Sequence, residues 1–181
     1  VVHGGMGIDS AYLRCEGVLE LAGPARRVVI YDQRGHGASG RSDPEAYSHA
    51  QWAADLRELA SHLNEGPIDV LGHSYGAFIA LEFASMYPSM LDQLILVGGS
   101  AGPVTRRVST LRSDEQVRAA FRARWPSMFG SQVVPWDVFE RCTFAFESFN
   151  AAFGRELPKY DLRTHVEQIK APTLLIVGEL D

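Results

Sequence analysis

A serine flanked by two glycines carries the clearest chemistry in this chain, in the run DVLGHSYGAFIA at residues 69–80. The apolar residues before the serine predict a short strand, and the apolar residues after it predict a helix that begins at once. A sharp strand-to-helix turn exposes a serine hydroxyl for attack on a carbonyl, and small neighbours such as Gly72 and Gly76 let that turn close. We therefore predict that Ser74 is a nucleophile.

A nucleophilic serine needs backbone N–H groups that hold the negative charge developing on the attacked carbonyl oxygen. The N–H of Tyr75, at the start of the helix, is the first expected donor. The second is expected from the glycine-rich run HGGMG at residues 3–7, where we assign the N–H of Gly5, with Met6 as the alternative. His3 is expected to brace this loop rather than to transfer protons.

An acid that orients a catalytic histidine is expected at Asp181, directly after a strand predicted at residues 173–177. Glu179 is the competing candidate for the same role. None of the six histidines is placed to act as the base on Ser74. In the chain order serine, acid, histidine the base would follow Asp181, so we predict that the catalytic histidine lies outside this sequence.

Composition narrows the classes of protein that fit. The chain has 181 residues, 46% of them hydrophobic, and a net charge of −5, which suits one globular domain and gives no basic surface for nucleic acid or an anionic membrane. No apolar run reaches the roughly 20 residues that span a bilayer. The expected partner is a small-molecule or short-peptide substrate, and the sequence leaves the oligomeric state open.

No cofactor or metal is expected, because no cluster of histidine, cysteine and carboxylate residues has ligand spacing and the Gly35–Gly37 segment lacks a phosphate-loop form. Cys15 and Cys142 are interpreted as free thiols of a reducing, cytoplasmic compartment, with a single disulfide as the alternative. Both ends interrupt predicted strands, so we expect an internal fragment, in which a targeting signal cannot be judged.

Strands and helices alternate along the chain, which predicts a mostly parallel, doubly wound α/β sheet. Strands are expected at residues 27–32, 68–71, 94–97 and 173–177, and a helix is expected after the capping residue Ser48. Asp32 and Arg34 are expected to contact each other in a structural loop. Residues 1–102 form the first part of the predicted core, residues 103–160 a helical cap insertion rich in aromatic residues, and residues 161–181 the continuation of the core.

These motifs together resemble the α/β-hydrolase superfamily over essentially the whole chain. The HGGMG run resembles its oxyanion loop, residues 72–76 its nucleophile elbow, and residues 172–181 its acid-bearing strand. Within the superfamily, HGGMG combined with YDQRGHGAS at residues 31–39 is similar to the proline iminopeptidase group. That group releases N-terminal proline from peptides, and acidic cap residues bind the free amino group; the resemblance offers Glu140 and Glu147 as counterparts.

The resemblance implies a serine hydrolase with a Ser-His-Asp triad, first of all an aminopeptidase for N-terminal proline. Two departures favour other members: Met6 replaces the usual proline, and the form Gly72-His73-Ser74 is commoner in esterases and lactonases. A carboxylesterase or lactonase is therefore the alternative, and a non-catalytic ligand-binding homologue is the second alternative.

Overall fold

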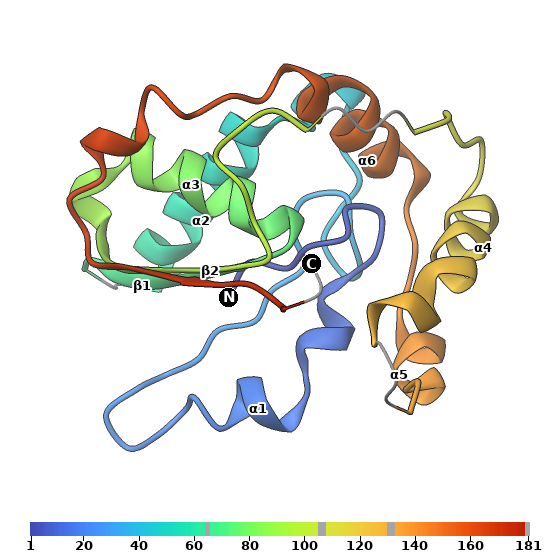
Figure 1. Cartoon of the computed structure of the whole chain (residues 1–181), viewed down its shortest axis with the longest axis horizontal. Coiled ribbons are helices and arrows are strands. Elements are labelled where there is room, and N and C mark those ends of the chain that lie inside the picture. The colour runs from blue at the N-terminus through green and yellow to red at the C-terminus, as the bar shows by residue number, and fades with distance from the viewer. Residues whose placement is uncertain (64–65, 105–107, 130–132, 180–181) are drawn as a thin grey trace.

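The computed structural model describes residues 1–63, 66–104, 108–129 and 133–179. Figure 1 shows a sheet with helices above it and a group of shorter helices to one side. Its α-helices are α1 (Glu16–Leu19), α2 (His49–His62), α3 (Tyr75–Met86), α4 (Asp114–Arg124), α5 (Trp136–Arg141) and α6 (Phe146–Asn150). Short 3-10 helices are η1 (Ser10–Leu13), η2 (Pro44–Ala46), η3 (Pro88–Met90), η4 (Trp125–Met128), η6 (Leu157–Lys159) and η7 (Val166–Gln168), and η5 (Ala151–Glu156) is a π-helix.

The described residues form a parallel three-stranded sheet in the order β1 (Ile68–His73), β2 (Leu91–Val97) and β3 (Thr173–Ile176). In register, His73 lies opposite Val97, and Val97 lies opposite Ile176. The carboxyl ends of all three strands therefore meet at one edge. This edge is where the loops of a parallel sheet can bring distant side chains together.

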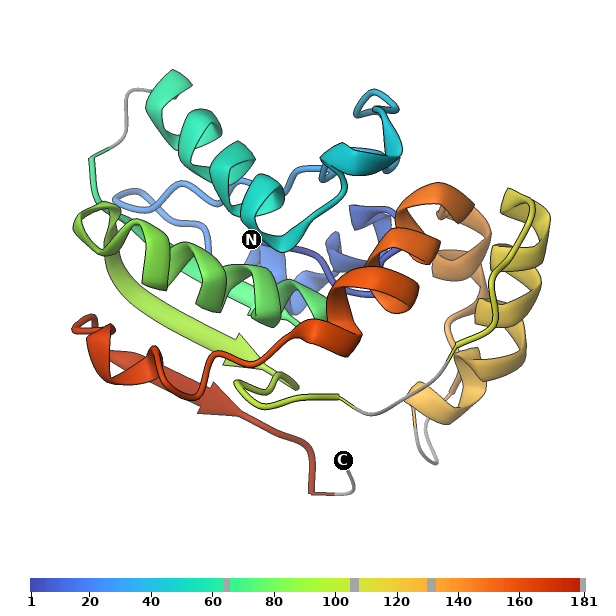
Figure 2. The same cartoon turned by 90° about the horizontal axis from the view of Figure 1, so that it is seen from above.

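Helices α2 and α3 cover one face of the sheet and lie side by side (Figure 2). Ser48 caps α2 by accepting a hydrogen bond from the Gln51 N–H at 3.1 Å, which confirms the predicted start of that helix. Helix α3 buries residues around its whole circumference, from Tyr75 to Ala84, as its apolar sequence predicts. The parallel sheet with its crossover helices confirms the predicted fold class.

The strand predicted at residues 27–32 is wrong. This segment carries no strand in the structure, although the nitrogen of Val1 donates to the carbonyl of Val29 at 2.8 Å. Val1 and Val2 lie between it and β1, where Val2 makes one parallel bridge to Gly72. In the described residues the apolar run therefore makes a single backbone contact with Val1 and no ladder.

A second hydrophobic cluster lies in the region predicted as a cap. Its buried members come from α4, α5, α6 and the connecting segments, together with one residue of the first loop: Ile8, Val117, Phe121, Trp125, Phe139, Cys142, Phe144 and Phe149. The main core lies between the sheet and helices α2 and α3. The aromatic residues of the cap region therefore largely pack against one another.

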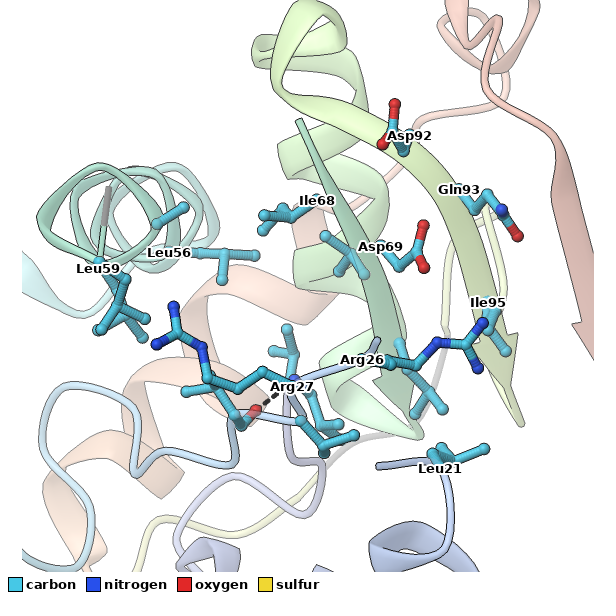
Figure 3. Close-up of a pocket in the computed structure, with 18 of the residues that line it drawn as sticks. Leu21, Arg26, Arg27, Leu56, Leu59, Ile68, Asp69, Asp92, Gln93 and Ile95 are labelled. Atoms are coloured by element: carbon cyan, nitrogen blue, oxygen red, sulfur yellow. Dashed lines mark hydrogen bonds between the residues drawn. The ribbon is translucent and has the colours of Figure 1, made fainter. Parts of the chain in front are cut away.

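A cavity of about 540 Å³ lies between α2, β1 and residues 21–31 (Figure 3). Its lining includes Leu56 and Leu59 from α2, Ile68 from β1, and Arg26 and Arg27 from the extended segment. No residue of the loop at 3–7 or of the turn at Ser74 belongs to this lining among the described residues. The cavity is therefore separate from the predicted nucleophile.

Candidate active site

Ser74 lies in a strained turn between β1 and α3. Its backbone angles are φ 53° and ψ −118°, and it is the single non-glycine residue with positive φ within the described ranges. Its N–H donates to the Val97 carbonyl at 2.7 Å, and its own carbonyl accepts from Ala77 at 2.9 Å. These bonds hold a conformation that costs a non-glycine residue about 1–3 kcal/mol.

The glycines on either side of Ser74 are required by close backbone contacts. A Cβ atom at Gly76 would lie 2.2 Å from the carbonyl oxygen of Val2, and one at Gly72 would lie 2.5 Å from the carbonyl oxygen of Gly76. Both distances are far below van der Waals contact. The G-x-S-x-G spacing thus lets α3 approach β1 and the first residues of the chain directly.

The glycine loop at residues 3–7 lies directly against the turn. A Cβ atom at Gly4 would lie 2.4 Å from the carbonyl oxygen of His73, 2.7 Å from Ser74 Cβ and 3.0 Å from the nitrogen of Tyr75. Gly5 follows in a left-handed conformation, with φ of 59°. The loop and the first turn of α3 therefore lie on the same side of Ser74.

Two backbone N–H groups, one in the glycine loop and one at the start of α3, are unengaged. Over the ranges that the structure covers, neither Gly5 nor Tyr75 donates its N–H to a protein acceptor. Tyr75 begins a 12-residue helix, so its N–H has no partner inside the helix, and the helix dipole adds positive potential there. The structure thus leaves both donors of the predicted oxyanion hole available.

The serine hydroxyl itself is also unengaged. Its Oγ makes no hydrogen bond to any described residue, and it does not cap the helix that follows. The side chain is partly exposed. A hydroxyl with these properties is accessible to a substrate carbonyl.

Two buried histidines hold the glycine loop in place. His3 accepts the N–H of Gln33 at Nε2 (3.1 Å), and its Nδ1 lies 3.0 Å from the Gly4 carbonyl. His36 accepts the N–H of Gly7 at Nε2 (2.9 Å), and its Nδ1 lies 3.0 Å from the Arg34 carbonyl. The bracing role expected of His3 is therefore seen, and His36 shares it.

Burial keeps both of these imidazoles neutral. Desolvation lowers the pKa of His3. Desolvation, and next to it the repulsion that a proton on His36 would meet from a protonated His3, lowers the pKa of His36 to about 3. A neutral imidazole with its proton on Nδ1 accepts at Nε2, as both N–H contacts require. These histidines are structural acceptors rather than bases for Ser74.

The side chain of Tyr75 ties the nucleophile turn to the cap region. Its hydroxyl donates to the Ala152 carbonyl of the π-helix η5 at 3.1 Å and lies 2.8 Å from His49 Nε2. Burial lowers the pKa of His49 to about 4 and raises the pKa of Tyr75 well above its ordinary value. Both groups stay neutral, so the first residue of α3 is fixed by uncharged hydrogen bonds.

The remaining histidines do not reach Ser74. The Nδ1 atom of His73 lies 2.8 Å from the Tyr12 hydroxyl. His62 is exposed at the end of α2, and His165 lies beside Thr164 at 3.1 Å. No hydrogen bond from a described histidine to the Ser74 hydroxyl is seen, and a base outside this sequence stays a prediction.

The predicted acid Asp181 lies outside the described residues. The competing residue Glu179 is exposed in the turn after β3. Since Ile176 lies in register with Val97 and His73, Glu179 follows the strand end at the same edge as Ser74. The edge expected to carry the acid is thus the edge that carries Ser74.

The predicted contact between Asp32 and Arg34 is wrong. Arg34 pairs with Asp55 of α2 through two hydrogen bonds of 2.7 and 2.6 Å. Asp32 accepts from the N–H and hydroxyl of Ser10 and from the N–H of Ala38, and these bonds lower the pKa of Asp32 against the opposing effect of burial. The structural role expected of both residues is retained with different partners.

The two cap glutamates are held by arginines. Glu140 pairs with Arg118 and Arg122, and Glu147 pairs with Arg41 at 3.1 Å. Each carboxylate is therefore engaged in an ion pair. A peptide amino group would have to compete with these arginines for either carboxylate.

Tyr12 is a residue that the sequence did not single out. Its hydroxyl accepts the Gly4 N–H at 2.7 Å as well as contacting His73. It lies on a short 3-10 helix with no periodic pattern, so no local signal marks it.

No group of histidine, cysteine and carboxylate side chains able to hold a metal ion occurs among residues 1–63, 66–104, 108–129 and 133–179. No helix in those same ranges is both long and apolar enough to cross a bilayer. Cys15 and Cys142 are both free, so the disulfide alternative is wrong.

Comparison with known proteins identifies the family. The α/β-hydrolase fold family matches residues 1–180, so the chain belongs to it. A putative carbamate hydrolase, RutD, of Serratia proteamaculans is 29% identical over 171 residues, which cover 86% of this chain and 63% of that protein. The chain thus spans somewhat less than two thirds of that curated relative.

Solved structures share the fold over nearly the whole chain. A hydrolase from Pseudomonas aeruginosa PA01 has a TM-score of 0.79 at 24% identity, over 98% of this chain and 69% of that one. The N-acyl homoserine lactonase AidH complexed with N-butanoyl homoserine has a TM-score of 0.68 at 20% identity, over 98% and 68%. The esterase EaEST from Exiguobacterium antarcticum has a TM-score of 0.68 at 22% identity, over 96% and 70%.

The predicted similarity to the proline iminopeptidase group is not supported. The named relatives are a carbamate hydrolase, a lactonase and an esterase. The ion-paired states of Glu140 and Glu147 agree with this correction.

Proposed function

We propose that this chain supplies the nucleophile and oxyanion hole of a serine hydrolase that acts on carboxylic esters or lactones by acyl transfer. The observation that carries the proposal is the environment of Ser74. An unengaged hydroxyl sits in a positive-φ turn, the glycine loop at residues 3–7 packs against that turn, and the N–H groups of Gly5 and Tyr75 have no acceptor in the described chain. No other part of the described fold combines these features.

In the proposed reaction, Ser74 Oγ attacks the substrate carbonyl carbon while a base removes its proton. The N–H groups of Gly5 and Tyr75 bind the resulting oxyanion, an interaction worth about 3 kcal/mol for each donor in comparable sites. The tetrahedral intermediate collapses, the alcohol leaves with the proton held by the base, and an acyl-enzyme remains. Water then attacks the acyl group and restores the serine.

The proposed base is a histidine outside these 181 residues, since the six within them are otherwise engaged or distant. Asp181 or Glu179, after β3, is proposed to orient that histidine from the shared sheet edge. The chain by itself is therefore expected to hydrolyse esters no faster than its Ser74→Ala variant.

The similarity to a lactonase and an esterase supports the ester or lactone class, and the apolar residues packed on the oxyanion loop agree with it. A Cβ atom at Gly5 would lie 2.7 Å from Ile8 and 3.3 Å from the ring of Phe121, both of which are buried in the aromatic cluster of the cap. Such an apolar wall suits the acyl chain of a neutral substrate. A peptide with a charged N-terminus would find both cap glutamates already paired.

The proposal is tested in the full-length protein with four chromogenic or titratable substrates: a p-nitrophenyl ester, an acyl homoserine lactone, an aryl carbamate and a proline p-nitroanilide. Turnover of the ester or lactone that is lost in Ser74→Ala and kept in the control Ser61→Ala supports it; Ser61 is exposed on α2. Carbamate turnover alone would assign the activity named for the RutD relative. Absence of turnover on all four, with ligand binding retained, would favour the non-catalytic alternative.

A further inference from the structure

The hydroxyl of Tyr12 joins the two halves of the oxyanion hole. It accepts the N–H of Gly4 at 2.7 Å and lies 2.8 Å from Nδ1 of His73. Gly4 directly precedes Gly5, the proposed donor in the loop, and His73 directly precedes Ser74. One phenol oxygen therefore connects the peptide before the donor to the residue before the nucleophile.

The helix that carries Tyr12 is anchored on two sides. Asp9, the N-cap of η1, accepts the N–H and hydroxyl of Thr143 in the cap region at 2.8 and 2.7 Å. Ser10 donates its N–H and hydroxyl to Asp32 at 2.9 and 2.7 Å. A hydroxyl on so restrained a support can set the position of a flexible glycine peptide.

We propose that Tyr12 is a positioning residue that clamps the glycine loop to the nucleophile turn, so that the N–H groups of Gly5 and Tyr75 converge on one oxyanion. This inference rests on the proposed hydrolase function. Gly5 has φ of 59° and no side chain, so the Gly4–Gly5 peptide has little intrinsic preference for the orientation it adopts. His3 Nδ1 holds the carbonyl of that peptide, and the Tyr12 hydrogen bond fixes the preceding His3–Gly4 peptide, so the two contacts together restrain the orientation of the Gly5 N–H.

The protons in the clamp fall into one consistent arrangement. The Gly4 N–H occupies one lone pair of the Tyr12 oxygen, which leaves the phenol proton to donate to His73 Nδ1. Burial raises the pKa of Tyr12 far above its ordinary value, so the phenol keeps that proton. His73 then carries its own proton on Nε2.

The test compares Tyr12→Phe with Tyr31→Phe in the full-length protein, with a p-nitrophenyl ester as substrate. Both substitutions delete one buried phenol oxygen, but the Tyr31 hydroxyl has no partner among the described residues. Because a misplaced donor weakens transition-state binding more than substrate binding, Tyr12→Phe is expected to lower kcat about ten- to a hundredfold with KM within about twofold. Tyr31→Phe is expected to leave both constants within about twofold.

A second measurement reports on the hydrogen bond itself. In the folded Tyr12→Phe variant, the amide proton of Gly4 is expected to move upfield in the NMR spectrum and to exchange faster with solvent. Neither change is expected in Tyr31→Phe. If Tyr12→Phe does not fold, His73→Phe tests the other arm, and a lower kcat at unchanged KM is again expected.

The outcomes separate the clamp from the hydrolase function on which it rests. Ester turnover that survives Ser74→Ala would refute the function. Loss of turnover in Ser74→Ala, together with equal kcat in Tyr12→Phe and Tyr31→Phe, would overturn the clamp alone. A rise in KM with unchanged kcat in Tyr12→Phe would also overturn it, since that result indicates a role in substrate binding.

Discussion

Replacing Ser74 by glycine is expected to make the protein more stable while it removes the nucleophile. The residue has φ 53° and ψ −118°. At these angles the Cβ atom of serine is sterically strained, whereas glycine has no Cβ atom and adopts them readily. Its hydroxyl caps no helix and makes no hydrogen bond in the described chain, so deletion of the side chain breaks no contact of that kind. The substitution therefore isolates the backbone strain.

The magnitude follows from two opposing terms. Relief of strain contributes about 1–3 kcal/mol, and the greater freedom of glycine in the unfolded chain opposes it by about 0.4–1 kcal/mol, which leaves a net gain centred on about 1.3 kcal/mol. For a chain of 181 residues a gain of that size raises the melting temperature by roughly 3–5 °C. Ser74→Ala is the matched control, because alanine removes the hydroxyl and keeps the strain.

The assay is urea unfolding of both variants, followed by circular dichroism, with the free energy of unfolding extrapolated to water. Ser74→Gly is expected to exceed Ser74→Ala in stability, and neither is expected to hydrolyse substrate in the full-length protein. A glycine variant no more stable than the alanine variant would show that the turn stores no strain.

Three further predictions concern the surroundings of the site. The pKa of His36 is about 3 in the folded protein against an ordinary 6.5, so the unfolded chain binds its proton first as the pH falls. The free energy of unfolding should therefore fall by up to about 1.4 kcal/mol for each unit by which the pH is lowered between those values. This dependence of stability on pH should become weaker in His36→Gln and stay unchanged in the exposed control His62→Gln. Gly37→Ala would place a Cβ atom 2.1 Å from the Asp32 carboxylate, whereas a Cβ atom at Gly40 would meet nothing within 4 Å. Gly37→Ala should therefore unfold at a markedly lower urea concentration than Gly40→Ala, and equal unfolding midpoints for the two variants would contradict the contact. Burial raises the pKa of the Cys142 thiol to about 12, so Ellman's reagent should titrate one thiol in the native chain and two in denaturant, and two native thiols would be inconsistent with this burial.

The sequence predicts the nucleophile turn well because its determinants are local. Gly72 and Gly76 sit within two residues of Ser74, and the contacts that require them involve β1, α3 and the first residues of the chain. The N-cap of α2 is equally local, since Ser48 accepts from a residue three positions later. Short-range geometry of this kind is encoded in the order of residue types.

Features that depend on distant partners are predicted less well. The apolar run at residues 27–32 has strand character, but a strand forms only where its backbone pairs with a neighbour, and residue composition does not indicate that pairing. Arg34 forms its ion pair with Asp55, 21 residues later in the chain, rather than with the nearer Asp32. The contact between Tyr12 and His73 joins residues 61 positions apart, and no periodic pattern in the sequence indicates it.

The separation of the two hydrophobic clusters bears on how the activity of such a fold can be altered. The aromatic cluster of the cap region packs mainly on itself, so exchanges within α4 and α5 can change this cluster without repacking the main core between the sheet and helices α2 and α3. The π-helix η5 does not share this freedom, because its Ala152 carbonyl accepts the hydrogen bond from Tyr75. A designer should therefore vary α4 and α5 and leave residues 151–156 unchanged, since a shift of η5 would displace Tyr75 beside Ser74.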